Sequence, residues 1–288
     1  MALADAVAHN LCLNTETQAG RFANELRRWR TSRRWSQLEL ATRAGTTQRH
    51  LSFMEQGRSQ PGRAIVLRLG ESLELSLRER NELLLAAGYA PAFVESKPGD
   101  AVRQPIRDAL NRILIGHLPC PAVVVRPYGE LVAANAALEI LSAGAAPFLL
   151  APPVNVLRLT LHPDGVARRV LNLPEWGRHI IENLRARSLR SPDQRLDAFV
   201  DELEGYVPAL APGPDHVGFA VPLRLQFDDG ELRLITTITS FATAVDIAVA
   251  ELVLEAFLPA DAASAEMLQR AQRERGDKPP LLRGLGSC

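Results

Sequence analysis

The chain has 288 residues, enough for about two domains. Its 47% hydrophobic and 23% charged residues exclude a disordered chain, a collagen and a disulfide scaffold. No run of 18 apolar residues occurs, and the first twenty residues lack a basic region followed by a long apolar core. We therefore expect a cytoplasmic protein with no transmembrane helix and no secretory signal. Cys12, Cys120 and Cys288 are widely spaced and are expected to be ordinary reduced thiols.

The 33 basic and 33 acidic residues balance over the whole chain but not along it. Residues 21–68 hold eleven arginines and three glutamates, a net charge of +8. The remaining residues are mildly acidic. This split indicates a head that binds a polyanion, joined to a body with another task, although a basic solvated surface without a partner gives the same count.

Residues 21–88 are predicted to form five short helices with tight joints. Phe22, Leu26 and Trp29 fall on one face of the first helix. Ser36 is the expected N-cap of the second, which Gly45 closes. The other three are expected from Thr46–Thr47 to Gly57, from about Ile65, and from Leu77 to Ala87.

Residues 95–100 are polar and carry Pro and Gly, so they are the best linker candidate. We expect a first domain over 18–92, a linker over 93–101, a second domain over 102–275 and a disordered tail over 276–288. The second domain begins with a predicted helix over 102–118 and a hairpin whose strands are 122–125 and 131–134.

Further helices are predicted at about 166–172, 174–190 and 193–205. Segments 219–227 and 232–241 alternate apolar and polar residues and are joined by Asp228-Asp-Gly230, which is typical of an antiparallel pair with one buried face. Residues 247–258 fit a strand or a helix, and a strand is favoured because it would complete the sheet. The second domain is therefore α+β.

Residues 37–56 meet the steric demands of a helix-turn-helix. Ala41 is small where the two helices cross closely, and Gly45 lies at the joint, where a positive φ is needed. Thr46 departs from the pattern, because its position usually buries an apolar side chain. The positions that pack the two helices together are apolar: Leu40, Ala44, Leu51 and Met54.

Residues 36–61, SQLELATRAGTTQRHLSFMEQGRSQP, closely resemble the Cro/repressor-type helix-turn-helix of XRE-family bacterial regulators. This resemblance implies a five-helix, lambda-repressor-like DNA-binding domain. The phrases PAVVVRPYGELVAAN, NVLRLTLHPDG, LPEWGRHI and DIAVAELVLEAFLPADAASAE resemble the MmyB-like ligand-binding domain of such regulators. That second resemblance implies a PAS-like α+β fold with an antiparallel sheet.

The first resemblance places the second helix of the motif in the major groove of double-stranded DNA. Carried over by position, Gln48, Arg49 and Ser52 face the bases, and Phe53 can touch a thymine methyl. The donor fork of Arg49 suits guanine and the amide of Gln48 suits adenine. The expected phosphate contacts are Gln37, Thr47, Arg58 and Arg63.

Other polar residues of the head have structural interpretations. The family pairs the positions of Arg30 and Glu55 in a buried salt bridge that fastens the first helix to the third. His50 faces away from the groove at this spacing. A solvated helix face is the plain interpretation of four more arginines: Arg27, Arg28, Arg33 and Arg34.

The body carries no catalytic or metal-binding motif: no G-x-S-x-G, no H-E-x-x-H, no phosphate-binding Gly-rich loop, and no histidines at metal-ligand spacing. We therefore expect neither an enzyme nor a metal site. His162 precedes a turn and is interpreted as a turn histidine, and Asn135 as an N-cap.

The PAS-like resemblance implies a pocket between a five-strand sheet and its covering helices. Its expected lining is apolar: Val124, Leu131, Leu223, Ile235 and Ile238, with Leu223 and Ile235 on the same buried face. Such a pocket suits a mostly apolar small molecule, a fatty acid being one candidate, and requires no cofactor. Candidates for its polar end are Asn155, Arg158, Trp176 and His179. Each has a structural alternative: for example, Arg158 pairing with an acid, Trp176 in the core, or Asn155 capping a helix.

The sequence thus favours a one-component transcription regulator, expected to be a homodimer that binds an operator and senses an apolar ligand, with no membrane contact. In the alternative, the body is only a dimerisation or protein-interaction module. An enzyme with a DNA-binding head is the weakest of the three hypotheses.

Overall fold

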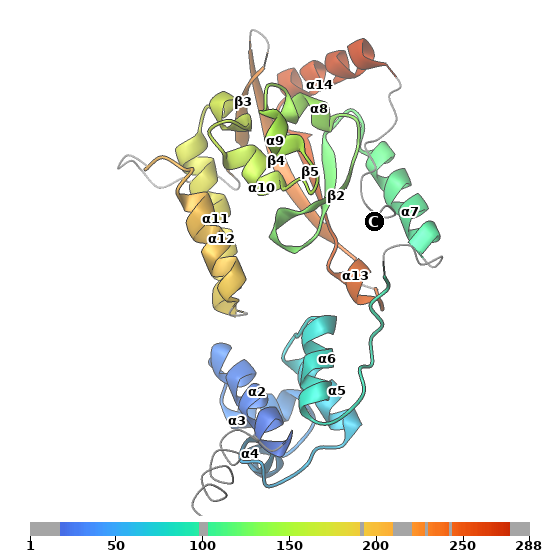
Figure 1. Ribbon diagram of the computed structural model, residues 1–288, viewed down its shortest axis with the longest axis vertical. Helices are drawn as coiled ribbons and strands as arrows, with labels where there is room; N and C mark the ends of the chain where they lie inside the picture. Colours follow the sequence, from blue (N-terminus) through green and yellow to red (C-terminus); the bar gives the residue numbers. More distant parts are fainter. Residues whose placement is uncertain are drawn as a thin grey trace, which may run out of the picture. The chain divides into compact units, whose positions relative to one another are not determined.

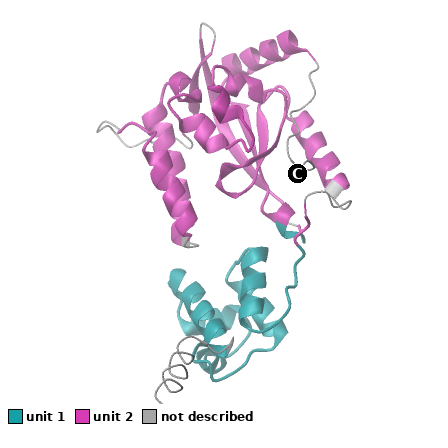
Figure 2. Cartoon of the chain, in the orientation of Figure 1, with its two compact units in different colours: residues 1–94, 245–247 teal, residues 95–244, 248–288 magenta. Residues whose placement is uncertain are grey.

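The computed structural model describes residues 18–97, 103–190, 193–209, 221–227, 230–241 and 244–276. The chain forms two compact units, residues 1–94 with 245–247 (unit 1) and residues 95–244 with 248–288 (unit 2) (Figure 2). Each unit has a hydrophobic core of its own. Most of the expected tail, two of the three cysteines (Cys12 and Cys288) and residues 98–102 around the expected linker lie outside the described residues.

Unit 1 is helical, and the five predicted helices are confirmed (Figure 1). Their N-termini are capped as the sequence indicates: the Ser36 Oγ accepts from the Glu39 N–H, and the Thr47 Oγ1 accepts from the His50 N–H. Ser76 and Glu79 form a capping box. The helices are α2 (Gln18–Ser32), α3 (Gln37–Arg43), α4 (Gln48–Glu55), α5 (Arg63–Ser72) and α6 (Leu77–Ala86).

The core of unit 1 joins all five helices. Phe22, Leu26 and Trp29 of α2 are buried together with the apolar positions of the helix-turn-helix. Gly45, between α3 and α4, has a φ of +60°. A side chain would strain the backbone there, so glycine allows the tight joint that sets α4 against α3.

Unit 2 is built on one antiparallel sheet of five strands in the order β2-β1-β5-β4-β3. The last strand in the sequence, β5, is therefore the central one. The strands are β1 (Ala122–Val125), β2 (Leu131–Ala134), β3 (Leu223–Phe227), β4 (Gly230–Ser240) and β5 (Val253–Pro259). This arrangement confirms the α+β prediction.

The strand predicted over 247–258 is wrong in its first half. Residues Ile247–Ala250 form a short helix, α13, and β5 begins only at Val253. The reason lies in the register: Val253 pairs with Ser240, the last residue of β4, and with Val125, the last residue of β1. Residues before Val253 therefore have no strand beside them. The predicted strand 219–227 likewise begins at Leu223, with residues 219 and 220 outside the described part.

Helices cover both faces of the sheet (Figure 1). Leu110 and Leu114 of α7 (Arg103–Gly116) pack on the face that carries Val124 and Leu254, here called the α7 face. The larger cluster lies on the opposite face, the main-core face, with Val123, Leu223 and Leu234. It is built with α8 (Leu138–Ser142), α9 (Pro147–Leu150), α10 (Val156–Leu161), α11 (Leu173–Arg190), α12 (Gln194–Glu204) and α14 (Ala262–Arg275).

Asn135 is not the N-cap that the sequence predicts. Its fully buried side chain accepts a hydrogen bond from the Ala122 N–H and donates to the carbonyls of Leu114 and Cys120. It thereby ties the end of α7 to β1, a contact between distant segments that local sequence does not reveal. The helix predicted over 166–172 is a single 3-10 turn over Val166–Arg169.

Candidate functional site

Helix α4 exposes one side and buries the other. Thr47, Gln48 and Arg49 at its N-terminus are exposed, whereas Leu51 and Met54 lie in the core. With 3.6 residues per turn, Ser52 and Phe53 continue the outer face and are partly exposed. All five outer residues belong to the predicted DNA-binding set, so one accessible strip holds the candidate base contacts.

Arg49 retains its hydrogen-bond donors for a partner. Its guanidinium lies 5.4 Å from the centre of the Phe53 ring, a cation–π contact that leaves the planar donor fork unused. Within the described residues it makes no ion pair. An exposed, preorganised guanidinium at the start of the helix is suited to the paired acceptors of a guanine edge.

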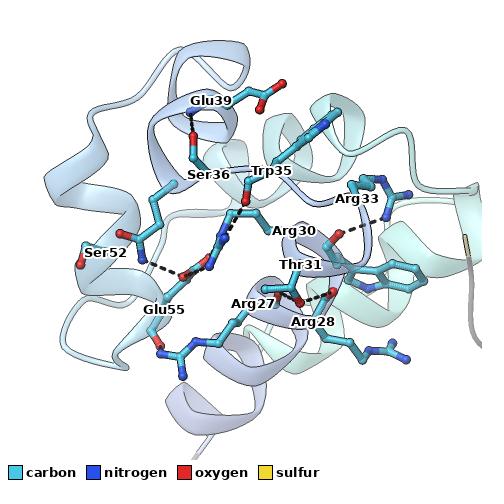
Figure 3. A network of polar contacts seen from close by, with 12 residues as sticks. Arg27, Arg28, Arg30, Thr31, Arg33, Trp35, Ser36, Glu39, Ser52 and Glu55 are labelled. Carbon is cyan, nitrogen blue, oxygen red and sulfur yellow. Dashed lines mark hydrogen bonds and ion pairs between the residues drawn. The ribbon is translucent and has the colours of Figure 1, made fainter.

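A buried polar network fastens α4 to α2 and α3 (Figure 3). The side chain of Glu55 has 0% exposure and accepts from Arg30 twice, from Nε at 2.6 Å and from Nη2 at 2.9 Å. The Gln37 Nε2 donates to the second Glu55 oxygen at 2.8 Å, and the Arg30 Nη1 donates to the Trp35 carbonyl at 2.7 Å. The hydrogen bond to Glu55 raises the pKa of Arg30. The predicted Arg30–Glu55 pair is confirmed.

The four candidate phosphate contacts differ in their surroundings. Arg58 and Arg63 are exposed, and Thr47 is exposed while its hydroxyl oxygen caps α4. Gln37 is only partly exposed, and its amide nitrogen is held by Glu55. Sequence reasoning missed this tie because it depends on a residue eighteen positions away. The backbone N–H of Gln37 at the start of α3 is then the group that suits a phosphate.

Three further arginines, in α2 and directly after it, make more contacts than a solvated face would. The Arg27 Nη2 donates to the Glu55 carbonyl at 3.0 Å, near the C-terminal end of α4. Arg28 and Arg33 stack on Trp29, at 4.6 and 5.3 Å from the ring centre. Burial lowers the pKa of Arg33. These side chains thus help to hold the helix that supports the motif.

A contact between Thr46 and His50 explains how Thr46 can stand at a turn position that usually buries an apolar side chain. The Thr46 Oγ1 lies 3.0 Å from the His50 Nδ1, so a side chain–side chain hydrogen bond replaces the apolar contact usual at this position. His50 therefore points to the turn rather than to the outer strip of α4. The sequence interpretation, that His50 faces away from the groove, agrees with this placement.

In unit 2, the residues predicted to line one pocket are divided between the two faces of the sheet. Leu223 pairs with Leu234, so these two share the main-core face, and Ile235 must point to the other. Leu223 is fully buried and Ile235 only partly. The prediction that both lie on the same buried face is wrong, because the assumed register of β4 was one residue out.

The other residues predicted to line the pocket are likewise divided between the two faces of the sheet. Val124 belongs to the cluster on the α7 face, with Ile235 on that side of the sheet. Leu131 packs against the main core, and Ile238 lies on the main-core face, four residues from Leu234. Ile238 is nevertheless 71% exposed, so the described helices leave this end of the face open.

The four candidates for a polar pocket end have separate structural surroundings. Asn155 caps α10, accepting from the Leu157 and Arg158 N–H groups. Arg158 forms a two-pronged ion pair with Glu202, at 2.6 and 2.7 Å. Trp176 is buried in the core, and His179 is exposed beside Asn183. The structural alternatives given for Asn155, Arg158 and Trp176 match these contacts.

Glu255 in β5 is a polar residue that the sequence interpretation did not single out. It lies on the main-core face between Val253 and Phe257, and burial raises the pKa of its carboxyl. The available signal was its position in VLEAFLP, where an acid alternates with apolar residues on one side of a strand.

None of the described helices is long and apolar enough to cross a bilayer. In the same part of the chain, no group of three or more His, Cys, Asp or Glu side chains is arranged to hold a metal ion.

Comparison with protein families matches both units. Residues 21–83 match a helix-turn-helix domain, and residues 106–271 match the MmyB-like transcription regulator ligand binding domain. No curated protein matches the chain. The two matched families are DNA-binding and ligand-binding domains rather than enzymes, and both resemblances seen in the sequence are confirmed. Because the second match covers more than half of the 288 residues, the chain belongs to the MmyB-like transcription regulators, with a helix-turn-helix domain preceding the ligand-binding domain.

Proposed function

We propose that the protein is a one-component regulator in which α4 reads an operator and unit 2 responds to a mostly apolar small molecule. The observation that carries the first half is the exposed strip of α4, held in place from behind by the buried Arg30–Glu55–Gln37 network. A base-reading helix needs both accessible side chains and a rigid support.

On this proposal the contacts divide into two kinds. Arg49 takes a guanine, Gln48 an adenine, Ser52 a further base edge and Phe53 a thymine methyl. Thr47, Arg58, Arg63 and the start of α3 at Gln37 contact phosphates and set the orientation of the head on the duplex. The charge of +8 over residues 21–68 supports this division, because phosphate contacts require a basic surface.

The ligand is proposed to be an apolar molecule bound by the main-core face of unit 2, with a fatty acid as the first candidate and no required cofactor. The support is the membership of residues 106–271 in a ligand-binding family together with the apolar composition of that face. A homodimer is proposed because two linked heads gain effective concentration on a two-fold operator. The place of action is proposed to be the cytoplasm, where the DNA of a bacterial cell lies.

The alternative gives unit 2 a dimerisation or protein-interaction role alone. It is weighed against ligand sensing by native mass spectrometry of the full chain purified without added ligand. We expect a dimer that carries, or takes up, an apolar small molecule. A dimer that stays empty when exposed to a lipid extract would favour the alternative.

The DNA-binding half is tested by selecting sites from random duplexes with the full-length protein. We expect recovered sequences with two half-sites about one helical turn apart, or a multiple of it. Recovery of unrelated sequences with no enrichment would contradict operator recognition by α4.

A further inference from the structure

The arginines of residues 21–68 differ in whether the head itself uses their charge. Of the eleven, five have hydrogen-bond or ion-pair partners inside unit 1: Arg27, Arg28, Arg30, Arg33 and Arg43. Three more are proposed above to contact DNA: Arg49, Arg58 and Arg63. The other three are Arg21, Arg34 and Arg68, whose side chains form no hydrogen bond or ion pair with the described residues. These three charges have no role so far.

Of these three, Arg68 reaches the joint of the helix-turn-helix. It is an exposed residue of α5, and its Nη1 lies 3.8 Å from the position that a Cβ would have on Gly45. Gly45 is itself exposed and lies between α3 and α4, just before Thr47, the N-cap of α4. A guanidinium from α5 thus stands beside the segment that leads into α4.

The charge of Arg68 is not offset at this joint. Arg43, the last residue of α3, is paired with Glu39 at 3.3 Å, whereas no described acid is paired with Arg68. The N–H groups of Gln48 and Arg49, the first two of α4, have no described acceptor, and free N–H groups at a helix start carry partial positive charge. An anion beside the joint would therefore meet the full charge of Arg68 and this smaller contribution from α4.

The proposed function supplies such an anion. On that proposal Gln48 and Arg49 contact base edges while Thr47 contacts a phosphate, so the DNA backbone runs close to the start of α4. Arg68 stands beside the turn and does not belong to the outer strip of α4. The part of the DNA that it can meet is therefore the backbone at the edge of the groove, and not a base inside it.

We infer that Arg68 is a further phosphate contact of the DNA-binding site, which α5 supplies to the joint of the helix-turn-helix. The inference rests on the proposed operator binding by α4 and adds a residue that the motif does not contain. A guanidinium donates charge-assisted hydrogen bonds to phosphate oxygens. Such a contact fixes the position of the head on the duplex and carries no sequence preference.

The test measures DNA binding by the full-length protein at several salt concentrations. Fluorescence anisotropy gives the affinity for an operator duplex recovered by selection and for a random duplex of equal length. We expect Arg68→Ala to weaken both by the same factor, about threefold to tenfold at low salt. The slope of log affinity against log salt concentration should become shallower by about 1, because one phosphate contact is lost.

Two further variants separate the charge of Arg68 from other effects. Arg68→Lys keeps the charge and should retain most of the affinity and the slope. Arg273→Ala, at an exposed position of α14, removes one positive charge from unit 2 and should change neither. Alanine is a good helix former, so the melting curve of Arg68→Ala should match that of the wild type.

Three results would contradict the inference in different ways. A loss confined to the operator would place Arg68 on a base and overturn the phosphate assignment. Unchanged affinity and slope for Arg68→Ala would show that the DNA backbone does not reach the joint, while operator binding by α4 would stand on the selectivity of the wild type. If the wild type binds neither duplex, this inference and the proposed DNA-binding function fail together.

Discussion

Glu55 in unit 1 is buried and Glu255 in unit 2 is partly buried, and the two carboxylates differ in their polar partners. The oxygens of Glu55 receive three hydrogen bonds from Arg30 and Gln37. Glu255 receives none from the described residues, and burial raises its pKa. The comparison separates two situations: a carboxylate whose partners are all present links helices and stabilises the fold, whereas one without them makes no such link and costs free energy when it is ionised and buried.

The arginines of unit 1 divide in the same way. Arg30 donates hydrogen bonds to the Glu55 carboxylate and to the Trp35 carbonyl inside unit 1. Arg49 is exposed on α4 and touches the Phe53 ring alone among the groups described. The satisfied charge of Arg30 therefore lies behind α4, and Arg49 lies on its exposed side, where a DNA base would supply acceptors.

The largest loss of stability is expected from the substitution Glu55→Gln. It leaves the Arg30 guanidinium, with a side-chain exposure of 13%, without its counter-charge. Removing one member of a buried ion pair costs about 3–5 kcal/mol, so we expect a loss of that size in the stability of unit 1. Urea-dependent hydrogen exchange on peptides from α2 and α4, read by mass spectrometry, measures unit 1 separately from unit 2.

The matched control is Glu25→Gln. Its partner Arg28 lies in α2, as Arg30 does. The Arg28 and Glu25 side chains are 45% and 38% exposed, however, so water screens this pair. We expect a change below about 1 kcal/mol. Similar losses for the two variants would mean that the Glu55 network is no more important than a surface ion pair.

The next largest effect concerns the unsatisfied arginine. Arg49→Ala should weaken operator binding by about 1–3 kcal/mol and leave binding to random DNA nearly unchanged, because a base contact adds only to the specific complex. Fluorescence anisotropy at fixed salt measures both. Arg58→Ala serves as control: a phosphate contact should weaken binding to both DNAs alike. Equal losses for Arg49→Ala would show that Arg49 contacts phosphate and that α4 is rotated from the proposed register.

The helix-turn-helix could be predicted from the sequence because its signals are local. Ser36 and Gly45 mark the ends of α3 by their own conformational preferences, and the apolar spacing gives the buried side of α4. The tie between Gln37 and Glu55 could not be predicted in the same way. It depends on how two helices come together, so a residue expected only at a phosphate also holds the network.

In unit 2, the alternation of apolar and polar residues was insufficient to predict which face of the sheet each residue of β4 occupies. In LRLITTITS, Leu232 and Leu234 fit one alternation, while Ile235 fits the other. Pairing with β3 decides between them, because Leu223 lies opposite Leu234. The register is thus set by a partner strand, and the lining of the proposed pocket changed with it. Glu255 lies in the segment 247–258, whose own pattern fits a strand or a helix, and the strand was favoured because it would complete the sheet.

Glu255→Gln should have the opposite sign to Glu55→Gln. Because burial raises the folded-state pKa of Glu255, the ionised carboxylate costs stability above that pKa, and the cost disappears as the pH falls through it. At about pH 8 we expect the variant to stabilise unit 2 by about 1 kcal/mol, since an amide is cheaper to bury than an unpaired charge. Hydrogen exchange on β5 peptides measures it. A loss of stability instead would reveal a favourable partner for the Glu255 carboxylate.

The smallest effect is expected at Glu231, a satisfied carboxylate near the surface. The hydrogen bond from Arg224, joined by one from Arg233, lowers its pKa to about 2. Its contribution to stability is therefore complete above the unfolded value near 4.5 and is lost as the pH falls toward 2. Because the Arg224 and Arg233 side chains are 39% and 49% exposed, solvent screening limits the contribution to below about 1 kcal/mol. Glu231→Gln should thus lower the melting temperature of unit 2 by no more than about 2–4 °C at neutral pH, and this difference from the wild type should shrink as the pH falls from about 4.5 toward 2. A fall as large as that expected for Glu55→Gln would show that having partners, and not burial, sets the energy of a carboxylate in this protein.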